Sequence, residues 1–435
     1  MPRSLKLVPP SSSSSTPQTI QIFGMDYWPD ATGIAPYTTG LAEYLAREGN
    51  QVDVIAGMPY YPEWSVKSGY ERSLRRMEVR NGVTIHRARQ FVPRRQSALR
   101  RAAFEGTFLL NAGIGHRTPR PDVVIGIVPA LSNGVLAARR AASLGVPLVL
   151  IIQDLLGQAA VQSGVDGGQR IAEVTSKLEG WIARQAAAIG IVASGFRPPL
   201  ERMGVDPSRI HSIRNWTHIQ QVTADRAKTR TGLGLPLTAP IVLHAGNMGL
   251  KQGLDNMIEA ARLAVTSAPE ILFVLMGDGN QRSHLEELAS GLPNVRFIDP
   301  QSNEDFPNIL AAADVLLVNQ LPSVVDMSLP SKLTSYFAVE RPVLAAVASN
   351  SETAKVVAES GGGRVVPAGD PAALVDELIR VTRSSELAAS LGLAGKLYAQ
   401  DHLSAEGALR RLDMLIRGEV PLIARATGAE EALAS

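Results

Sequence analysis

The sequence predicts an α/β protein with two doubly wound sheets of mostly parallel strands. Its 435 residues are too many for one ordinary hydrophobic core and suit two domains of about 200 residues each. Along both halves, short runs of Val, Ile and Leu alternate with amphipathic stretches. Because continuous apolar runs are typical of strands covered on both faces, we expect a parallel sheet in each half.

The first half opens with a β-α-β unit, in which the strands Thr19–Phe23 and Val52–Ile55 flank the helix Tyr37–Arg47. Five later apolar runs are also predicted to be strands. They are Val83–His86, Val123–Ile127, Leu148–Ile152, Ala188–Val192 and Ile210–Ile213. The first domain is therefore expected to span residues 19–222.

The same pattern restarts after the polar stretch Ala224–Pro240. Six strands, most of them separated by helices, are predicted in this half. They are Ile241–Ala245, Ile271–Met276, Val295–Phe297, Val315–Val318, Val343–Ala345 and Arg364–Val366. We place the second domain at residues 223–402 and expect loose tails at residues 1–18 and 419–435.

The composition excludes several classes of protein. The chain has no cysteine, which rules out disulfides, thiolate catalysis and Cys-ligated metal sites. The uncharged apolar stretch Val123–Ala138 is shorter than the roughly 20 residues that span a bilayer. The Pro- and Ser-rich run Pro9–Pro17 stands where a secretory signal would need an apolar core. We expect a cytoplasmic protein with no nucleic-acid partner.

Charge is distributed unevenly along the chain. Residues 71–101 hold ten Arg against only Glu71 and Glu78, whereas the rest of the chain has 33 basic and 39 acidic residues. A basic segment in an otherwise acidic protein indicates an anionic partner, and we predict that Arg72–Arg101 binds an anionic membrane surface. The alternative is a solvated face whose Arg stems cover apolar surface.

The motifs of common cofactor sites are missing. The turn after the first strand, Gly24–Ile34, has no G-x-G-x-x-G pattern, and the chain has no Walker A sequence. Its seven His include no H-x-H or H-x-x-x-H pair, so we expect no metal centre. NAD and P-loop chemistry are therefore not predicted.

A glycine-rich turn, His244–Gly253, follows the first strand of the second half and leads into a helix near Leu254. Its glycines allow close approach of the backbone N–H groups, and Lys251 adds positive charge, which suits a diphosphate. The alternative is that these glycines serve only the backbone angles of the turn.

A second candidate for anion binding is Asp326–Tyr336, in which Pro330 and Ser331 predict a helix start. Lys332 then lies in the first turn, where a cation opposes the helix dipole. A bound phosphate would remove that conflict. The alternative is an exposed Lys on a surface turn.

With these residues in view, the chain resembles glycosyltransferase family 4, and most closely its colanic-acid and exopolysaccharide branch. The resemblance spans residues 19–418. It is carried by eight short segments at residues 27–34, 59–64, 153–154, 213–216, 246–253, 276–279, 329–332 and 341–343.

The resemblance implies a GT-B fold, whose two domains face each other across a cleft, and a retaining transfer with no metal ion or other cofactor. It implies a nucleotide-sugar donor and a glycan or lipid-diphosphate-linked acceptor in exopolysaccharide or cell-surface polysaccharide biosynthesis. The enzyme would work in the cytoplasm, at the inner face of the membrane. A last helix at residues 403–418 would cross back to the first domain.

The resemblance also implies where the donor binds. The expected contacts are Gly246, Asn247, Gly249, Gln252, Gly277, Asp326, Ser331, Leu333, Thr334 and Ser335. Asn247 and Gln252 replace an Arg and a Lys of the wider family. Of the family's two glutamates, the later falls on Ser335 and the earlier near Asp326 or Met327. The donor sugar and base are left open by these departures.

Three residues are predicted to act in the transfer itself. Lys251 and Lys332 would stabilise the leaving diphosphate. Asp154 would orient the acceptor hydroxyl, the alternative being a helix cap.

The first domain is expected to supply the acceptor side. Its predicted residues are Thr32, Gly33, Tyr37 and Tyr61. The aromatic loop of Tyr60, Tyr61 and Trp64 would hold a sugar or a lipid, or would simply be packed.

Two other functions fit the same fold. One is a sugar-nucleotide epimerase, which needs acids and bases at the strand ends, where this chain offers few. The other is an inactive homologue that binds nucleotide or glycan as a scaffold, as the replaced Arg, Lys and Glu positions would allow.

Overall fold

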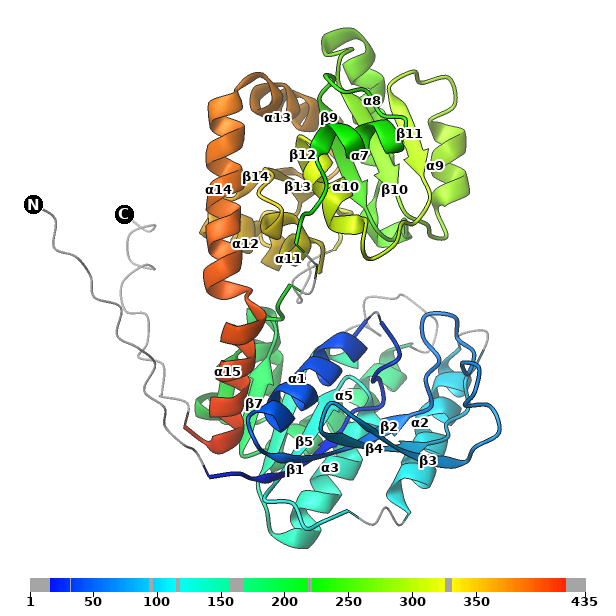
Figure 1. Cartoon of the computed structure of the whole chain (residues 1–435), viewed down its shortest axis with the longest axis vertical. Helices are drawn as coiled ribbons and strands as arrows, with labels where there is room; N and C mark the ends of the chain where they lie inside the picture. Colours follow the sequence, from blue (N-terminus) through cyan, green and yellow to red (C-terminus); the bar gives the residue numbers. More distant parts are fainter. Residues whose placement is uncertain are drawn as a thin grey trace, which may run out of the picture. The chain divides into compact units, whose positions relative to one another are not determined.

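The computed structural model of the chain is shown in Figure 1. It describes residues 16–31, 33–93, 97–114, 118–156, 168–217, 219, 221–324 and 331–419. The chain divides into two compact units, residues 1–149 and 150–435. None of the helices in the described ranges combines the length and the apolar composition of a membrane span.

The first sheet has eight strands in the order β3-β4-β2-β1-β5-β6-β7-β8. They are β1 (Thr19–Phe23), β2 (Gln51–Gly57), β3 (Arg75–Arg80), β4 (Val83–Ala88), β5 (Val123–Val128), β6 (Leu148–Ile152), β7 (Ala188–Ile191) and β8 (Ile210–Ser212). Strand β1 pairs in parallel with β2 and β5. Only the edge strand β3 is antiparallel to its neighbour among the pairings that the structure describes.

Strand β3 was not predicted from the sequence. Its residues Arg-Arg-Met-Glu-Val-Arg contain only two apolar side chains, Met77 and Val79, and both are largely exposed. The strand therefore pairs along the edge of the sheet without adding to the core. The predicted strands of this sheet all form, and most of their apolar runs are buried on both faces.

Helices accompany the strands of the first sheet. They are α1 (Ala35–Arg47), α2 (Ala98–Gly113), α3 (Leu131–Leu144), α5 (Gly168–Gln185) and α6 (Arg197–Arg202), with short 3-10 turns at Ser194–Phe196 and Pro207–Arg209. Ser97 caps α2 by accepting a hydrogen bond from the Arg100 N–H. Gly145 ends α3 in the left-handed conformation that glycine adopts most easily.

The second sheet has six strands in the order β11-β10-β9-β12-β13-β14, and each pairing is parallel. They are β9 (Ile241–Ala245), β10 (Leu272–Met276), β11 (Val295–Ile298), β12 (Val315–Asn319), β13 (Val343–Val347) and β14 (Gly363–Pro367). The strand order reverses between β9 and β12. In doubly wound sheets this switch point is where ligands bind, at the carboxyl ends of the strands.

The helices of the second half begin with α7 and end with α15. They are α7 (Arg226–Gly232), α8 (Asp255–Ser267), α9 (Arg282–Leu288), α10 (Phe306–Ala312), α11 (Ser331–Ala338), α12 (Glu352–Ser360), α13 (Pro371–Arg383), α14 (Ser385–His402) and α15 (Ala405–Arg417), with a 3-10 turn at Leu250–Gln252. Helix α8 packs against α13.

Alternate residues of strand β10 belong to two different hydrophobic clusters. Phe273 and Leu275 lie in one cluster with residues of α8, whereas Val274 and Met276 lie in the other with residues of α11. Helices thus cover both faces of the second sheet, as the continuous apolar runs predicted. The two doubly wound, mostly parallel sheets expected from the sequence are confirmed.

Helix α15 packs against strand β7. A Cβ atom added to Gly190 would lie 3.2 Å from Leu415 Cδ2 and 3.8 Å from Leu412 Cδ2. Both leucines are buried on the apolar face of α15. A side chain at position 190 would separate this helix from the strand.

We predict that Gly277→Ala destabilises the second sheet strongly. Its φ of 137° is unfavourable for Ala, and the added Cβ would lie 2.0 Å from the Gly246 carbonyl oxygen. We expect a loss of about 3 kcal/mol in the free energy of unfolding, measured by denaturant titration. The matched control is Gly291→Ala, where φ is 81° and nothing lies within 4 Å, so about 1 kcal/mol should be lost. Equal losses in both variants would contradict the close contact.

Candidate functional site

The turn after β9 is tied by backbone hydrogen bonds to the loop after β10. The Gly246 N–H donates to the Met276 carbonyl at 2.8 Å, and the Met248 N–H donates to the Asp278 carbonyl at 2.8 Å. In return, the Gln281 N–H donates to the Met248 carbonyl at 3.0 Å. The glycine turn is therefore held in place at the carboxyl edge of the second sheet.

Two glycines of the β10 loop make this contact sterically feasible. A Cβ at Gly277 would lie 2.0 Å from the Gly246 carbonyl oxygen, and one at Gly279 would lie 2.4 Å from the Met248 carbonyl oxygen. The Gly277 N–H already donates to the Ile298 carbonyl at 3.0 Å. Gly277 was predicted to contact the nucleotide-sugar. In the structure it shapes the turn through its backbone.

The second part of the turn is closed by Gln252. Its Oε1 accepts a hydrogen bond from the Gly249 N–H at 3.2 Å. Lys251 and Asn247 have exposed side chains, which leaves both available to a ligand. The side chain that replaces the family's Lys, Gln252, therefore works within the turn.

Asn319, at the end of β12, fixes the turn from the other side of the switch point. Its Nδ2 donates to the carbonyls of Gln252 and Gly253, each at 2.8 Å. Its Oδ1 accepts a hydrogen bond from Asn256 Nδ2 at 2.8 Å. This amide network joins the turn, β12 and the first turn of α8.

Lys332 is in the first turn of α11, as the sequence predicted, and it lies beside the glycine turn. Its Nζ is 3.4 Å from the position that a Cβ would take at Gly246. Burial lowers the pKa of Lys332 to about 8, and no carboxylate among the described residues forms an ion pair with it. At pH 7 the structure therefore holds a half-buried ammonium group without a counter-ion beside the turn.

His244, the residue before the end of β9, was missed by the sequence reasoning. It is fully buried, and burial together with the nearby Lys332 lowers its pKa to about 3. The imidazole is neutral at pH 7, so it adds no positive charge to that of Lys332 beside the turn. A polar residue within the apolar run Ile-Val-Leu-His-Ala was the signal in the sequence.

The other predicted residues of α11 turn toward the protein interior. Leu333, Thr334 and Ser335 are all buried, and Leu333 belongs to a hydrophobic cluster. The Tyr336 hydroxyl accepts a hydrogen bond from the Ala245 N–H at 2.9 Å, which anchors α11 to β9. Asp326 and the side chain of Ser331 lie outside the described part of the structure.

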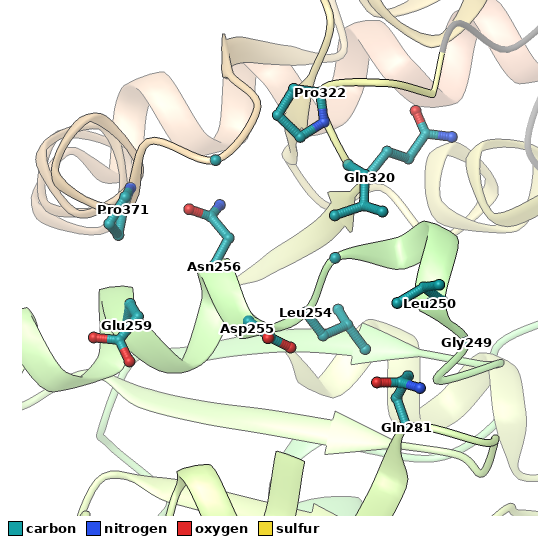
Figure 2. Close-up of a pocket in the computed structure, with 13 residues that line it drawn as sticks. Gly249, Leu250, Leu254, Asp255, Asn256, Glu259, Gln281, Gln320, Pro322 and Pro371 are labelled. Atoms are coloured by element: carbon teal, nitrogen blue, oxygen red, sulfur yellow. The ribbon is translucent and has the colours of Figure 1, made fainter. Parts of the chain in front are cut away.

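A pocket of about 330 Å³ opens beside the turn, next to the first turn of α8 (Figure 2). It is lined by Gly249, Leu250, Gly253, Leu254, Asp255, Asn256, Glu259, Gln281, Gln320, Leu321, Pro322, Gly369 and Pro371. These residues include no Lys or Arg. Asn256 is buried, and its Oδ1 has no hydrogen-bond partner among the described residues. The pocket suits an uncharged group that donates an N–H or O–H hydrogen bond. The diphosphate expected at the turn would instead lie beside Lys332.

Asp154 follows β6 at the carboxyl end of the first sheet. It is half-buried, and its Oδ1 accepts a hydrogen bond from the Leu155 N–H at 2.8 Å. Gln153 and Asn215 beside it exchange two amide hydrogen bonds of 3.2 and 2.7 Å. The Asp154 carboxylate thus lies at the strand end, where the sequence predicted it.

The structure brings together two of the predicted acceptor-side residues. A Cβ at Gly33, whose φ is 67°, would lie 3.5 Å from Tyr61 Cε1. Tyr37, by contrast, is buried on α1, and burial raises the pKa of its hydroxyl to about 12. Thr32 lies outside the described residues.

Asp26, after β1, is a further candidate that the sequence reasoning missed. Its Oδ1 accepts a hydrogen bond from the Tyr60 hydroxyl at 2.9 Å, and burial raises its pKa to about 6. The only sequence signal was an Asp shortly after the first strand.

In the described part of the chain, no three His, Asp or Glu side chains gather as metal ligands.

Both halves of the chain match known protein families. A model of the glycosyl transferase 4-like domain matches residues 32–216, and one of glycosyl transferases group 1 matches residues 239–384. WcaI of Escherichia coli K12, named as a colanic acid biosynthesis glycosyl transferase, is 30% identical over 92% of this chain and 100% of its own length.

Two solved structures share the fold. Sucrose-phosphate synthase of Thermosynechococcus elongatus has a TM-score of 0.73 at 19% identity and covers 92% of this chain and 98% of its own. HepE of Anabaena, solved with UDP-glucose, has a TM-score of 0.64 at 16% identity and covers 92% of this chain and 100% of its own.

We predict that Lys332→Met weakens the binding of inorganic diphosphate about 10- to 100-fold at pH 7, because it removes a charge-assisted hydrogen bond. Calorimetry on both proteins from pH 7 to 9.5 is the measurement. Because the pKa of Lys332 is about 8, the advantage of the wild type should begin to decline above that pH.

Lys355→Met, at an exposed position on α12, is the matched control and should bind like the wild type. A constant ratio of wild-type to Lys332→Met affinity across this pH range would contradict the assignment of the anion to Lys332.

Proposed function

Since the chain belongs to glycosyltransferase family 4 and has the GT-B fold, we propose that it moves a sugar from a nucleotide-sugar to a glycan or lipid-linked acceptor. One observation carries the donor side of this proposal. Lys332 holds an ammonium group without a counter-ion among the described residues beside a glycine turn at the switch point of the second sheet. A diphosphate supplies the missing negative charge.

The proposed chemistry needs two things from the protein. The C1–O bond to the diphosphate breaks, so negative charge develops on the leaving oxygen, and Lys332 with the exposed Lys251 stabilises it. The acceptor hydroxyl must be held on the same face of the sugar for the configuration to be retained. Asp154 and the acceptor-side residues of the first sheet serve that purpose in our proposal.

The relatives support a nucleotide-sugar donor and a role in surface polysaccharide synthesis. HepE was solved with UDP-glucose, and WcaI is named for colanic acid biosynthesis. We propose the same class of donor and of pathway for this chain. The lining of the pocket beside the turn, which in the described part of the chain includes no Lys or Arg, fits an uncharged part of the donor.

The decisive experiment is an assay with labelled UDP-, GDP- and TDP-sugars and an extract of lipid-linked acceptors. Transfer of label to the lipid fraction supports the proposal. Isomerisation of the donor without transfer would identify an epimerase, and binding without turnover would identify an inactive scaffold. Either result would overturn the proposed transferase function.

We predict that transfer survives EDTA. We propose that charge on the leaving diphosphate is met by Lys332 and Lys251, with no need for a cation, and no cluster of His, Asp or Glu ligands forms among the described residues. Initial rates with and without an excess of EDTA are the measurement. Loss of activity that magnesium or manganese restores would refute metal independence.

We also propose reversible attachment to the cytoplasmic face of the membrane through the Arg72–Arg101 region. Four of its arginines form ion pairs within the described part of the chain: Arg76 and Arg87 with Glu78, Arg80 with Glu43, and Arg101 with Glu105. The outward positive charge is therefore smaller than the sequence count indicates.

Apolar side chains make up part of this surface. Leu74, Met77 and Val79, in and before β3, are 70%, 69% and 72% exposed, and Leu99 on α2 is 85% exposed. Phe104 and Phe108 on α2, by contrast, are buried in the core and are not part of this surface. Exposed aliphatic residues beside arginines suit insertion into an anionic interface.

We predict that the wild type sediments with anionic liposomes and that binding weakens steeply with salt. A variant with Arg72, Arg94, Arg95 and Arg100 changed to Gln, which leaves the Arg101–Glu105 pair intact, should lose most of the binding. A variant with Arg262, Arg296, Arg380 and Arg383 changed to Gln is the charge-matched control and should still bind. Equal sedimentation of both variants, or indifference to salt, would show that the region is an ordinary solvated surface.

A further inference from the structure

Side chains from two loops gather at the carboxyl end of β1 and β2. Asp26 follows β1 by three residues, and Tyr60 follows β2 by three residues. The Tyr60 hydroxyl donates to Asp26 Oδ1 at 2.9 Å, and no described residue donates a hydrogen bond to Oδ2. One oxygen of this half-buried carboxylate is therefore held, and the other is available to a ligand.

An aromatic wall stands beside this carboxylate. The ring centroids of Tyr60 and Trp64 are 5.2 Å apart, those of Tyr61 and Trp64 are 6.2 Å apart, and those of Trp64 and Phe104 are 6.1 Å apart. Tyr60 and Phe104 are buried, whereas Tyr61 and Trp64 remain half-exposed. The buried rings support the two that can meet a ligand.

The backbone of this loop is strained and firmly held. Trp64 has a φ of 50°, which a bulky residue rarely adopts. Asp30 Oδ2 accepts hydrogen bonds from the N–H groups of Tyr60 and Tyr61 at 3.2 and 3.3 Å, and Asp30 also pairs with Lys67 at 3.0 Å. The aromatic wall is thus preorganised.

The charges around Asp26 disfavour a phosphate. Arg101 pairs with Glu105 at 3.0 Å, and Glu105 also accepts a hydrogen bond from the Ser132 hydroxyl. With Lys67 engaged by Asp30, the described cluster holds no excess of positive charge. A carboxylate beside aromatic rings instead matches a neutral sugar, whose hydroxyl groups donate and whose C–H face stacks on a ring.

We propose that Asp26, Tyr61 and Trp64 form the subsite that binds a neutral glycosyl ring of the acceptor. This inference rests on the proposed transferase function. The Asp26 carboxylate accepts hydrogen bonds from sugar hydroxyls, the half-exposed rings pack on the C–H face, and Tyr60 positions the carboxylate. The diphosphate of a lipid-linked acceptor lies outside this subsite.

The subsite binds the sugar at full strength only when Asp26 is ionised. The pKa of Asp26 is raised to about 6, mainly by burial; the Tyr60 hydrogen bond and Arg101 oppose this shift, and Asp30 and Glu105 add to it. Below pH 6 the protonated carboxyl loses half of its acceptor capacity and the attraction of a full charge. The KM for the acceptor should therefore rise as pH falls through about 6.

Asp26→Asn is the first test, with acceptor KM, donor KM and the pH profile as readouts. We expect the acceptor KM to rise about 10- to 100-fold with the donor KM unchanged, and the acid limb near pH 6 to disappear. Tyr60→Phe removes a hydrogen bond that favours the ionised form, so its acid limb should move to higher pH. Glu48→Gln, at an exposed acid of the same unit, is the control and should match the wild type.

Ligand binding separates failure of this subsite from failure of the transferase function. Saturation-transfer NMR with the methyl glycosides of glucose, galactose, mannose and fucose needs no turnover. At least one should bind the wild type and lose binding in Asp26→Asn and Trp64→Ala, and farnesyl diphosphate should not compete. Thermal melts of each variant verify folding. Equal glycoside binding by wild type and Asp26→Asn, no binding of any glycoside, or displacement by farnesyl diphosphate would overturn the subsite, whether or not the chain transfers sugar.

Discussion

The backbone contact between the glycine turn after β9 and the loop after β10 is the constraint on which the candidate donor site depends. Two pairs of peptide groups approach so closely that a side chain at position 277 or 279 would have no room. The contact fixes Gly246 below Lys332 and fixes Gly249 at the wall of the pocket. Any loosening here would move the ammonium group and the pocket independently, and the geometry for a diphosphate would be lost.

Lys332 shows why such a site is unstable without its ligand. Its folded-state pKa of about 8 is below the usual value of 10.5, so the unfolded chain binds this proton more tightly. Protonated Lys332 therefore lowers the free energy of unfolding at pH 7, and this penalty is relieved as pH rises from 8 to 10.5. A bound diphosphate favours the charged form and removes the same penalty, so ligand binding and stability are coupled.

Most of the fold could be predicted from the sequence, because strands that are buried on both faces have continuous apolar sequences. Strand β3 was not, since an edge strand with Met77 and Val79 exposed has no buried face to shape its sequence. Lys332 could be placed because a proline and a serine mark the helix start. The burial of Leu333 and Ser335 could not, because the rotation of a helix about its axis depends on what packs against it.

His244 and Asp26 were missed for a different reason. Each is a single polar residue whose chemical behaviour comes from burial and from neighbours distant in the sequence. The role of Gln252 was also hidden, since its hydrogen bond to Gly249 exists only once the turn is formed. Sequence patterns report the residues that repeat along an element, whereas these three act through contacts that only the folded chain creates.

The two candidate sites have opposite electrostatic character, and under the proposed function this difference would sort the parts of the substrates. Beside the glycine turn an ammonium group has no counter-ion among the described residues, whereas around Asp26 the described cations are all paired with carboxylates. A diphosphate gains charge neutralisation at the first site and would meet repulsion from Asp26 and Glu105 at the second. A neutral sugar ring gains little from an ammonium group but finds a carboxylate and two aromatic faces at the second. Each unit can thus reject the wrong end of a molecule that carries both a sugar and a diphosphate, a discrimination that shape alone would not give.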